Sequence, residues 1–264
     1  MARTDAARCP LRVLLVRPER SPDEFADSLI RLGATVYRCP VMAIVPLNDG
    51  QPAEQIKSRV LDFDHYQIAI FISRNAARLG LEWLDSYWPM LPAGVRYYAV
   101  GKSTAEVLEA YGVSVEAPGG SSDSEALLAL PSLQSVSGER ALLFAGRGGR
   151  GLLAEELARR GARVERCELY ERQKTLGHAE EINRLLSGGE LQLLVAHSGE
   201  LLTHLLDVVA EENRRKLLAL PLLVPGQRVA GLASHLGWQE VIVANSALRN
   251  DMVSAILEWY SNNG

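Results

Sequence analysis

The sequence predicts an α/β protein made of two similar domains, each a parallel sheet flanked by helices. Six segments each combine a short apolar run, a polar loop and an amphipathic helix, and the six divide into two sets of three that resemble each other. Strands that alternate with helices are typical of doubly wound sheets. The 264 residues suffice for two domains of ordinary size.

Each segment predicts one strand and the helix that follows it. The apolar runs are short and hardly alternate with polar residues, as in strands buried on both faces of a parallel sheet. Apolar residues three and four positions apart predict the helices. Four helices are followed by glycines that we expect in left-handed caps, namely Gly33, Gly112, Gly161 and Gly237. The segments cover residues 13–36, 68–84, 97–115, 141–164, 193–209 and 222–241.

The two sets of segments resemble each other in order. LLVRP and LIRLGATVYRCPV of the first segment resemble LLFAG and LARRGARVERCELY of the fourth. FISRNAARLGLEWL resembles VAHSGELLTHLL, and AVGKSTAEVLEAYGVSVEA resembles LVPGQRVAGLASHLGWQEVIVA. Each pair is offset by roughly 125 residues, which indicates an internal duplication. Two similar domains predict a cleft between them that binds the ligand.

The carboxyl ends of parallel strands are where ligands bind in such sheets. Basic or histidine side chains follow all six predicted strands, and the helices that begin there add free N–H groups and positive dipole ends. We therefore expect a ligand with several negative charges, although each side chain alone could be an ordinary solvated loop residue, and Arg17 could pair with Glu19. The candidates are Arg17, Ser73, Arg74, Lys102, Ser103, Thr104, Arg147, Arg150, His197, Ser198, Gln227 and Arg228.

Composition excludes several classes of protein. Lys and Arg number 28 against 32 Asp and Glu, so the net charge of −4 argues against a general nucleic-acid binder. No apolar run approaches the roughly 18 residues that span a membrane. Cys9, Cys39 and Cys167 lie far apart, without a C-x-x-C or Cys/His cluster, so we expect neither disulfides nor a metal site. A reducing cytoplasm fits this pattern.

A glycine motif offers an alternative function. Gly146, Gly148 and Gly151 spell G-x-G-x-x-G after a predicted strand, as in dinucleotide-binding folds. The matching loop VRPERSP lacks these glycines, and Arg147 and Arg150 would crowd a pyrophosphate. We therefore expect a tight turn in which Gly146 and Gly148 adopt unusual backbone angles. A nucleotide-dependent oxidoreductase and a non-enzymatic sensor of an anionic ligand remain the alternatives.

The motifs together resemble a known family. VLLVRPERSPDEFADSLIRLGATVYRCPVMAIVPL, IFISRNAA, YYAVGKSTAEVL and LLFAGRGGRGLLAEELARRGARVERCELYER, in that order, resemble uroporphyrinogen-III synthase from about Leu11 to about Leu257. The resemblance implies two flavodoxin-like α/β domains joined by a two-stranded linker. One domain would comprise residues 1–43 plus 173–264 and the other residues 46–168, with connecting strands near 40–46 and 168–173.

The resemblance also implies an activity. The family's substrate is hydroxymethylbilane, an open tetrapyrrole with acetate and propionate arms, which a lyase closes with loss of water and inversion of ring D to give uroporphyrinogen III in tetrapyrrole biosynthesis. No cofactor and no metal are needed. From the composition we expect a cytoplasmic protein that contacts neither nucleic acid nor membrane. We also expect a monomer whose contact with hydroxymethylbilane synthase is transient.

Individual residues acquire roles from the same resemblance. Tyr170 in CELYER matches the family's proton-donating tyrosine, with a core aromatic as the alternative, and Thr104 in GKSTAEV matches a threonine at a helix start, with a helix cap as the alternative. Ser73 and Ser198 match paired serine loops, and Arg17 matches the arginine of the first loop. Two positions depart from the family pattern: Val229 replaces a common threonine, and His197 replaces a small residue or proline.

Overall fold

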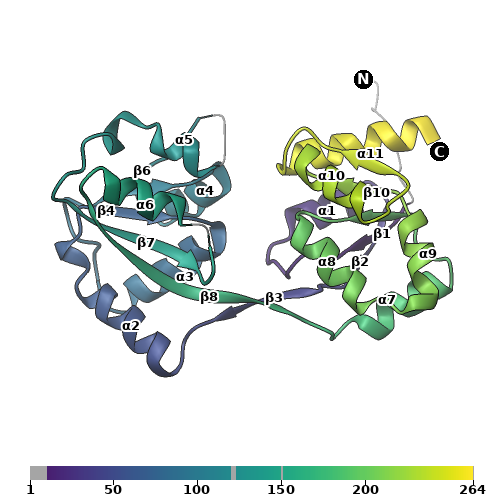
Figure 1. Cartoon of the computed structure of the whole chain (residues 1–264), viewed down its shortest axis with the longest axis horizontal. Coiled ribbons are helices and arrows are strands. Elements are labelled where there is room, and N and C mark those ends of the chain that lie inside the picture. The colour runs from purple at the N-terminus through teal and green to yellow at the C-terminus, as the bar shows by residue number, and fades with distance from the viewer. Residues whose placement is uncertain (1–10, 120–122, 150, 264) are drawn as a thin grey trace, which may run out of the picture. The chain divides into compact units, whose positions relative to one another are not determined.

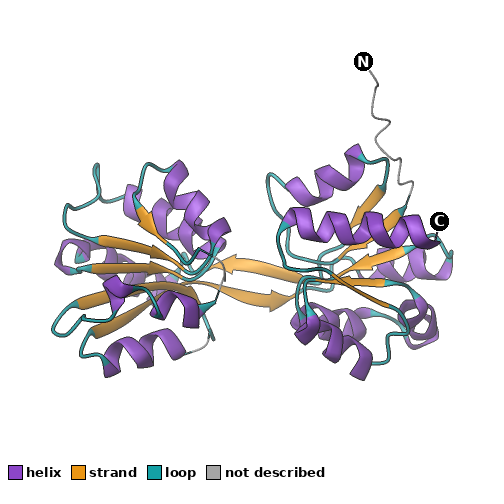
Figure 2. Ribbon diagram, turned by 90° about the horizontal axis from the view of Figure 1, so that it is seen from above, coloured by secondary structure: helices purple, strands orange, loops and turns teal. Residues whose placement is uncertain are grey.

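The chain folds into two compact units (Figure 1). The structure is a computed structural model that describes residues 11–119, 123–149 and 151–263. Unit 1 comprises Met1–Ala43 and Gln173–Gly264, and unit 2 comprises Ile44–Arg172. Both are α/β units in which helices cover both faces of the sheet, as Figure 2 shows for each. No helix of the described residues has the length and apolar character required to cross a membrane.

The sheet of unit 1 is parallel throughout its paired strands. Within the described residues its order is β11-β10-β9-β1-β2. The strands are β1 (Arg12–Leu15), β2 (Thr35–Arg38), β9 (Leu193–Val195), β10 (Leu222–Val224) and β11 (Val241–Val243). The helices are α1 (Glu24–Arg31), α7 (Ala179–Ser187), α8 (Gly199–Val208), α9 (Glu211–Ala219), α10 (Gln227–His235) and α11 (Arg249–Asn263).

Both faces of this sheet are buried. Successive strand residues point to opposite faces, so Leu14 and Leu194 join the core that lies against α7 to α10. Val13 and Leu193 join the second core, which includes residues of α1 and α11. The central strands β1, β9 and β10 are almost wholly buried. The predicted short apolar strands of a doubly covered parallel sheet are therefore confirmed.

Unit 2 has a sheet of order β3-β8-β7-β4-β5-β6 within the described residues, and β8-β7, β7-β4, β4-β5 and β5-β6 are parallel pairs. The strands are β3 (Met42–Pro46), β4 (Ile68–Phe71), β5 (Arg96–Ala99), β6 (Val115–Glu116), β7 (Arg140–Gly146) and β8 (Arg163–Lys174). The helices are α2 (Gly50–Leu61), α3 (Arg74–Asp85), α4 (Lys102–Ala110), α5 (Ser124–Leu128) and α6 (Leu152–Arg159), with 3-10 turns η1 (Phe63–His65) and η2 (Pro131–Leu133). Phe71 and Phe144 stack in its core, with ring centroids 4.6 Å apart.

The strand orders of the two units agree with the internal repeat of the sequence. When β3 is set aside, unit 2 reads β8-β7-β4-β5-β6 and unit 1 reads β2-β1-β9-β10-β11. The segment pairs that resemble each other thus occupy matching places, with β7 equivalent to β1, β4 to β9 and β5 to β10. The order of connections reverses between β1 and β9 in unit 1 and between β7 and β4 in unit 2. Such a reversal is where α/β sheets bind ligands at their carboxyl edge.

The strands β3 and β8 run from one unit into the other. The unit boundary falls between Ala43 and Ile44 in β3 and between Arg172 and Gln173 in β8. The two strands are neighbours in the sheet order. Their neighbouring backbone segments also bond, because the N–H of Leu47 donates to the carbonyl of Leu169 at 2.9 Å.

Glycine caps end the helices as the sequence predicts. Helices commonly end at a residue in the left-handed conformation, and glycine adopts this conformation easily because it has no Cβ. All four expected positions have this conformation, so the prediction is confirmed. Their φ angles are 92° at Gly33, 85° at Gly112, 91° at Gly161 and 101° at Gly237.

Candidate functional site

Tyr170 of β8 is held at the carboxyl edge of the sheet of unit 2. Its side chain is buried, and its hydroxyl lies 2.9 Å from Oγ of Ser73, which follows β4. Its carbonyl accepts a hydrogen bond of 2.7 Å from the N–H of Arg147, which follows β7. The ends of three neighbouring strands therefore fix one phenol hydroxyl at the place where the order of connections reverses.

Gly146 makes room for the tyrosine ring. A Cβ built on Gly146 would lie 2.6 Å from Cε2 of Tyr170, far inside van der Waals contact. The strand pairing of β7 and β8 shifts register at this point, so that Gly146 faces Tyr170. Gly148 has the predicted unusual conformation, with φ of 74°, but Gly146 is not among the residues with positive φ. The expectation for Gly146 is therefore wrong, and close approach of a side chain explains this glycine instead.

Ser73 has a second hydrogen bond. It is the N-cap of α3, and its Oγ accepts from the N–H of Ala76 at 3.1 Å. A serine hydroxyl has two lone pairs and one proton. After this cap bond, Ser73 can still either accept from the phenol of Tyr170 or donate to it. The pair can therefore support the phenol in both its protonated and its ionised form.

Arg147 is already paired. Its guanidinium lies 3.0 Å from Oε2 of Glu171 and 3.6 Å from Oε2 of Glu168, the acidic residues on either side of Tyr170 in β8. The sequence predicts that Arg147 binds a ligand carboxylate, and in this structure glutamates take that place. Its side chain is 46% exposed, so exchange of these partners for a ligand is sterically open. Arg150, the other arginine of this loop, lies outside the described residues.

The starts of α3 and α4 carry the other candidates of unit 2. Arg74, Lys102 and Ser103 are exposed in the first turns, where free N–H groups favour anions. Thr104 is buried, and it is the third residue of α4, whose N-cap is Gly101. The alternative that Thr104 is a helix cap is therefore wrong.

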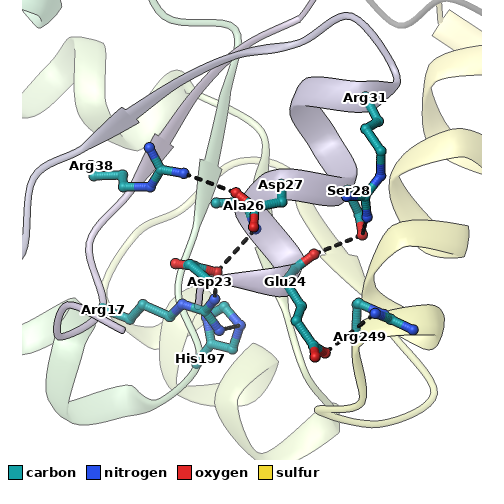
Figure 3. Close-up of polar contacts among 10 residues, drawn as sticks. All are labelled: Arg17, Asp23, Glu24, Ala26, Asp27, Ser28, Arg31, Arg38, His197 and Arg249. Carbon is teal, nitrogen blue, oxygen red and sulfur yellow. Dashed lines mark hydrogen bonds and ion pairs between the residues drawn. The ribbon is translucent and has the colours of Figure 1, made fainter. Parts of the chain in front are cut away.

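Arg17 is buried at the matching edge of unit 1 (Figure 3). Its guanidinium forms an ion pair with Asp23, and Nη1 lies 3.1 Å from Nε2 of His197. The guanidinium carbon also lies 5.3 Å from the ring centroid of Phe25, which meets the imidazole edge-to-face at 5.4 Å. Asp23 caps α1 by accepting from the N–H of Ala26 at 3.0 Å. Arg17 is thus not the solvated loop residue that the sequence left open.

His197 is neutral in this setting. Burial, and then the positive charges of Arg17 and Arg20, hold the pKa of His197 well below 6.5. A guanidinium only donates, so Nε2 of His197 accepts from Arg17 and the ring proton belongs on Nδ1. Nδ1 is buried and has no hydrogen-bond partner among the described residues. The fold therefore brings together Arg17 and His197, two candidates that lie 180 positions apart.

A pocket of about 440 Å³ adjoins Arg17 in unit 1. Its lining contains as many acidic as basic side chains, so their formal charges cancel. The pocket is therefore not the basic surface that the sequence predicts. Its charged lining residues are Arg17, Glu19, Arg20, Asp23, Asp27 and Arg38.

The remaining candidates of unit 1 lie at helix starts. Ser198 is the N-cap of α8, but its side chain makes no capping bond. Gln227 and Arg228 are exposed in the first turn of α10. Val229 is buried three residues after the N-cap Gly226, as Thr104 is three residues after Gly101. Val229, which has no hydroxyl, thus occupies the position in unit 1 that is equivalent to that of Thr104 in unit 2.

Sequence reasoning missed some of the charged partners. Asp23 was identifiable, because Ser-Pro-Asp-Glu before an apolar helix is a helix-start signal. Glu168 and Glu171 flank Tyr170 in the motif itself, but nothing in the motif says which arginine they bind. The structure also gathers Cys39, His178 and Glu181 in unit 1, a group of metal-ligating type that no sequence spacing reveals.

The fold and the site define an α/β protein of two units with matching strand order. One unit holds a tyrosine–serine hydroxyl pair, and the other holds a buried arginine–histidine pair. A family model described as Uroporphyrinogen-III synthase HemD matches residues 23–254. The uroporphyrinogen-III synthase of Escherichia coli K12 is 32% identical over 251 residues, which are 93% of this chain and 100% of that protein. That of Salmonella typhimurium is 34% identical over 252 residues, with 93% and 100% coverage.

Solved structures agree on the fold. A mutant uroporphyrinogen-III synthase from Thermus thermophilus has a TM-score of 0.61 at 19% identity, covering 96% of this chain and 100% of that chain. Uroporphyrinogen-III synthetase from Helicobacter pylori has a TM-score of 0.59 at 14% identity, with 96% and 99% coverage. The chain belongs to the uroporphyrinogen-III synthase family, a family of enzymes of porphyrin biosynthesis. These findings do not support the nucleotide-dependent oxidoreductase.

Proposed function

We propose that this protein is a lyase that converts hydroxymethylbilane into uroporphyrinogen III, with loss of water, ring closure and inversion of ring D, and without a cofactor. The observation that carries the proposal is the phenol of Tyr170, which is held at the carboxyl edge of its sheet by Ser73. The family membership supports the choice of reaction.

Tyr170 is the proposed proton donor. The hydroxyl group of the substrate leaves as water only when it receives a proton, and a positioned phenol can supply that proton. The carbon–oxygen bond breaks, water departs with the proton of Tyr170, and the substrate becomes a cationic azafulvene. Ser73 can then donate its own hydroxyl proton into a hydrogen bond with the phenolate 2.9 Å away. The substituted carbon of ring D next attacks the exocyclic carbon of the azafulvene and forms a spiro intermediate. The bond between ring D and the bridge carbon from ring C then breaks and re-forms at the free carbon of ring D, and the proton lost from that carbon returns to the phenolate of Tyr170. Conformational control of the first attack favours the type III isomer over spontaneous closure.

We propose that the candidate residues identified in the sequence bind the substrate's carboxylates. The exposed groups at helix starts suit this role best, because side chain and backbone N–H groups act together there. Arg147 contributes after exchange of its glutamate partners, and Arg150 remains a candidate on the strength of its place in the glycine loop. The proposed contacts are Arg17, Ser73, Arg74, Lys102, Ser103, Thr104, Arg147, Arg150, His197, Ser198 and Arg228.

The organisation we propose is a pair of flavodoxin-like domains joined by a two-stranded linker. The strand order β2-β1-β9-β10-β11 of unit 1 is the 2-1-3-4-5 order of that fold class, and unit 2 matches it by its permuted order. The linker is formed by β3 and β8. We further propose a cytoplasmic monomer that makes a transient contact with hydroxymethylbilane synthase, because a substrate that closes spontaneously to the type I isomer must pass quickly from one enzyme to the next.

Product analysis tests the proposed reaction. Freshly generated hydroxymethylbilane is given to the purified protein, and the oxidised products are separated into type I and type III uroporphyrin. An excess of type III supports the proposal. Type I alone, formed at the spontaneous rate, overturns it. A change of NAD(P)H fluorescence on addition of the protein would instead favour the oxidoreductase alternative.

A further inference from the structure

Three side chains of metal-ligating type meet in unit 1 although they are far apart in the chain. They are Cys39, His178 and Glu181, and one ligand atom of each lies within 4.8 Å of the others. Nδ1 of His178 lies 3.4 Å from Oε2 of Glu181. None of the three belongs to the Tyr170–Ser73 pair, which lies in unit 2.

The core of unit 1 fixes this group. Cys39 follows β2 and is fully buried, and its N–H donates to the carbonyl of Leu15 at 3.0 Å. His178 is the N-cap of α7, and Glu181 is in the first turn of the same helix. The buried face of α7 packs in the same apolar cluster as Cys39, which places the start of α7 against the end of β2. The group is therefore held by the packing of two secondary-structure elements.

The donor set has the chemistry of a zinc site. Thiolate sulfur, imidazole nitrogen and carboxylate oxygen are the ligands of Zn²⁺, and three protein ligands leave a fourth position for water. Bonds of roughly 2.0–2.3 Å in a tetrahedral site put the ligand atoms roughly 3.5 Å apart. The ligand atoms of the three side chains, which lie up to 4.8 Å apart, must therefore move about 1 Å closer together when the ion binds.

The exposure of the ligands allows this contraction and provides an entry path. Cys39 is fixed at the bottom of the group, whereas the side chains of His178 and Glu181 are 33% and 45% exposed and can rotate towards the sulfur. Burial, and then the neighbouring Glu181, raises the pKa of the Cys39 thiol to about 12. The thiol is therefore protonated in the absence of a cation, and binding must release this proton, as metal binding to cysteine does in general.

We propose that Cys39, His178 and Glu181 bind one divalent cation, with Zn²⁺ as the best match, and that the bound ion ties the start of α7 to the end of β2. A ligand that binds the folded state alone raises its stability by mass action. The ion therefore stabilises unit 1 and takes no part in the proposed proton transfer by Tyr170.

Cobalt is the probe that tests this site. Co²⁺ is added to the full-length protein after treatment with EDTA, and the near-ultraviolet absorption of thiolate-to-cobalt charge transfer is followed. We expect one cobalt per chain at micromolar concentrations, displaced by Zn²⁺, and a rise in melting temperature when Zn²⁺ is present. Absence of the charge-transfer band at micromolar Co²⁺ would overturn the proposal.

Matched variants assign the thiol. Cys39→Ala should abolish the band, whereas Cys167→Ala should keep it. Cys167 is a closely matched control because it is also fully buried, at the equivalent ARVERC position of unit 2. It is not part of any such group among the described residues. Cys9→Ala should also keep the band. A band that persists in Cys39→Ala, or one that is lost in either control, would refute the assignment.

A variant at a partly exposed residue tests the site without the risk that Cys39→Ala fails to fold. His178→Gln changes a partly exposed helix cap and leaves the core intact, and we expect it to weaken cobalt binding by at least about tenfold. Its melting temperature without metal should equal that of the unaltered protein, and the rise on addition of Zn²⁺ should be lost. Unchanged cobalt affinity in this variant would also overturn the proposal.

Discussion

The phenol oxygen of Tyr170 lies 2.9 Å from Oγ of Ser73, 97 positions earlier in the chain. The pair exists because β8 and β4 flank β7 in the sheet of unit 2, so that Tyr170 and Ser73 meet across the end of β7. Gly146 of β7 has no side chain, and the tyrosine ring occupies the space where a Cβ would be. Tyr170, Ser73 and Gly146 thus depend on one another, and the contribution of each can be tested separately.

Replacing Tyr170 with Phe tests the proton donor. The ring remains in place and only the hydroxyl is lost, so we expect turnover to fall by about 10- to 100-fold, at the modest end of general-acid effects. The measurement is the rate of type III product formation. Tyr97→Phe is the control, because the hydroxyl of Tyr97 is buried in the same unit without a hydrogen-bond partner among the described residues. Equal kinetics in the two variants would remove Tyr170 from the mechanism.

Ser73→Ala should affect both stability and turnover. The variant loses the cap of α3 and the partner of Tyr170, and loss of a serine cap costs about 1 kcal/mol of unfolding free energy. Urea unfolding and product-formation rates measure the two effects. Ser198→Ala is the matched control for stability, because Ser198 occupies the N-cap of α8 without a capping bond. An equal loss of stability in the two variants would contradict the assignment of the cap.

Gly146→Ala should push the ring of Tyr170 out of place. Its new Cβ meets Cε2 of Tyr170 at 2.6 Å, and overpacking of this kind costs about 1–3 kcal/mol. We expect turnover to fall together with stability. Gly231→Ala is the opposite case, since Gly231 lies inside α10 with open space around it, and alanine there should stabilise by about 0.5–1 kcal/mol. Unchanged stability of Gly146→Ala in urea would show that the ring is not held as described.

Asp23→Asn should destabilise unit 1 strongly. Loss of one charge from a buried ion pair is strongly destabilising, at about 3 kcal/mol. Asp27→Asn is the control in the same helix, because the Arg38–Asp27 pair spans 3.5 Å with both side chains 45% exposed (Figure 3). Such exposed pairs contribute at most about 1 kcal/mol. Urea unfolding of both variants should separate them, and similar losses would contradict the buried pair.

The buried His197 should make the folded protein less stable in acid. Its pKa in the folded protein is held well below 6.5, by burial first and then by Arg17 and Arg20, so the unfolded chain binds a proton that the folded chain does not. Stability should therefore fall as the pH drops below about 6.5, by up to about 1.4 kcal/mol per pH unit, and stay level above it. His197→Gln should lack this contribution. A stability difference between the two proteins that is the same at about pH 7 and about pH 5 would contradict the prediction.

Much of the fold follows from local patterns in the sequence. The apolar runs identify the central strands, such as β9 and β4, because strands buried on both faces carry no polar alternation. The segment pairs identify the matching strand orders, because a duplicated chain repeats its turns and caps. Gly161 and Gly237 end helices as predicted, since a left-handed cap depends only on the residue itself.

The site is less accessible to such reasoning, because it depends on which side chains meet across the sheet. The sequence identifies Arg17 and His197 as candidates, but their contact and the burial of Asp23 follow from strand order and helix packing. The sequence predicts an unusual backbone angle for Gly146, whereas its role is set by the ring of Tyr170, which lies 24 positions later in the chain. The gathering of Cys39 with His178 is likewise a product of tertiary packing.

The isomer ratio of the product is the most direct test of the proposed function. Hydroxymethylbilane is generated in EDTA-treated buffer without nucleotide, and the fraction of type III uroporphyrin is measured as the protein concentration rises. The account predicts that this fraction rises with protein concentration from the spontaneous background towards complete conversion, and that Tyr170→Phe requires more protein for the same fraction. A product that stays type I at every protein concentration would contradict it.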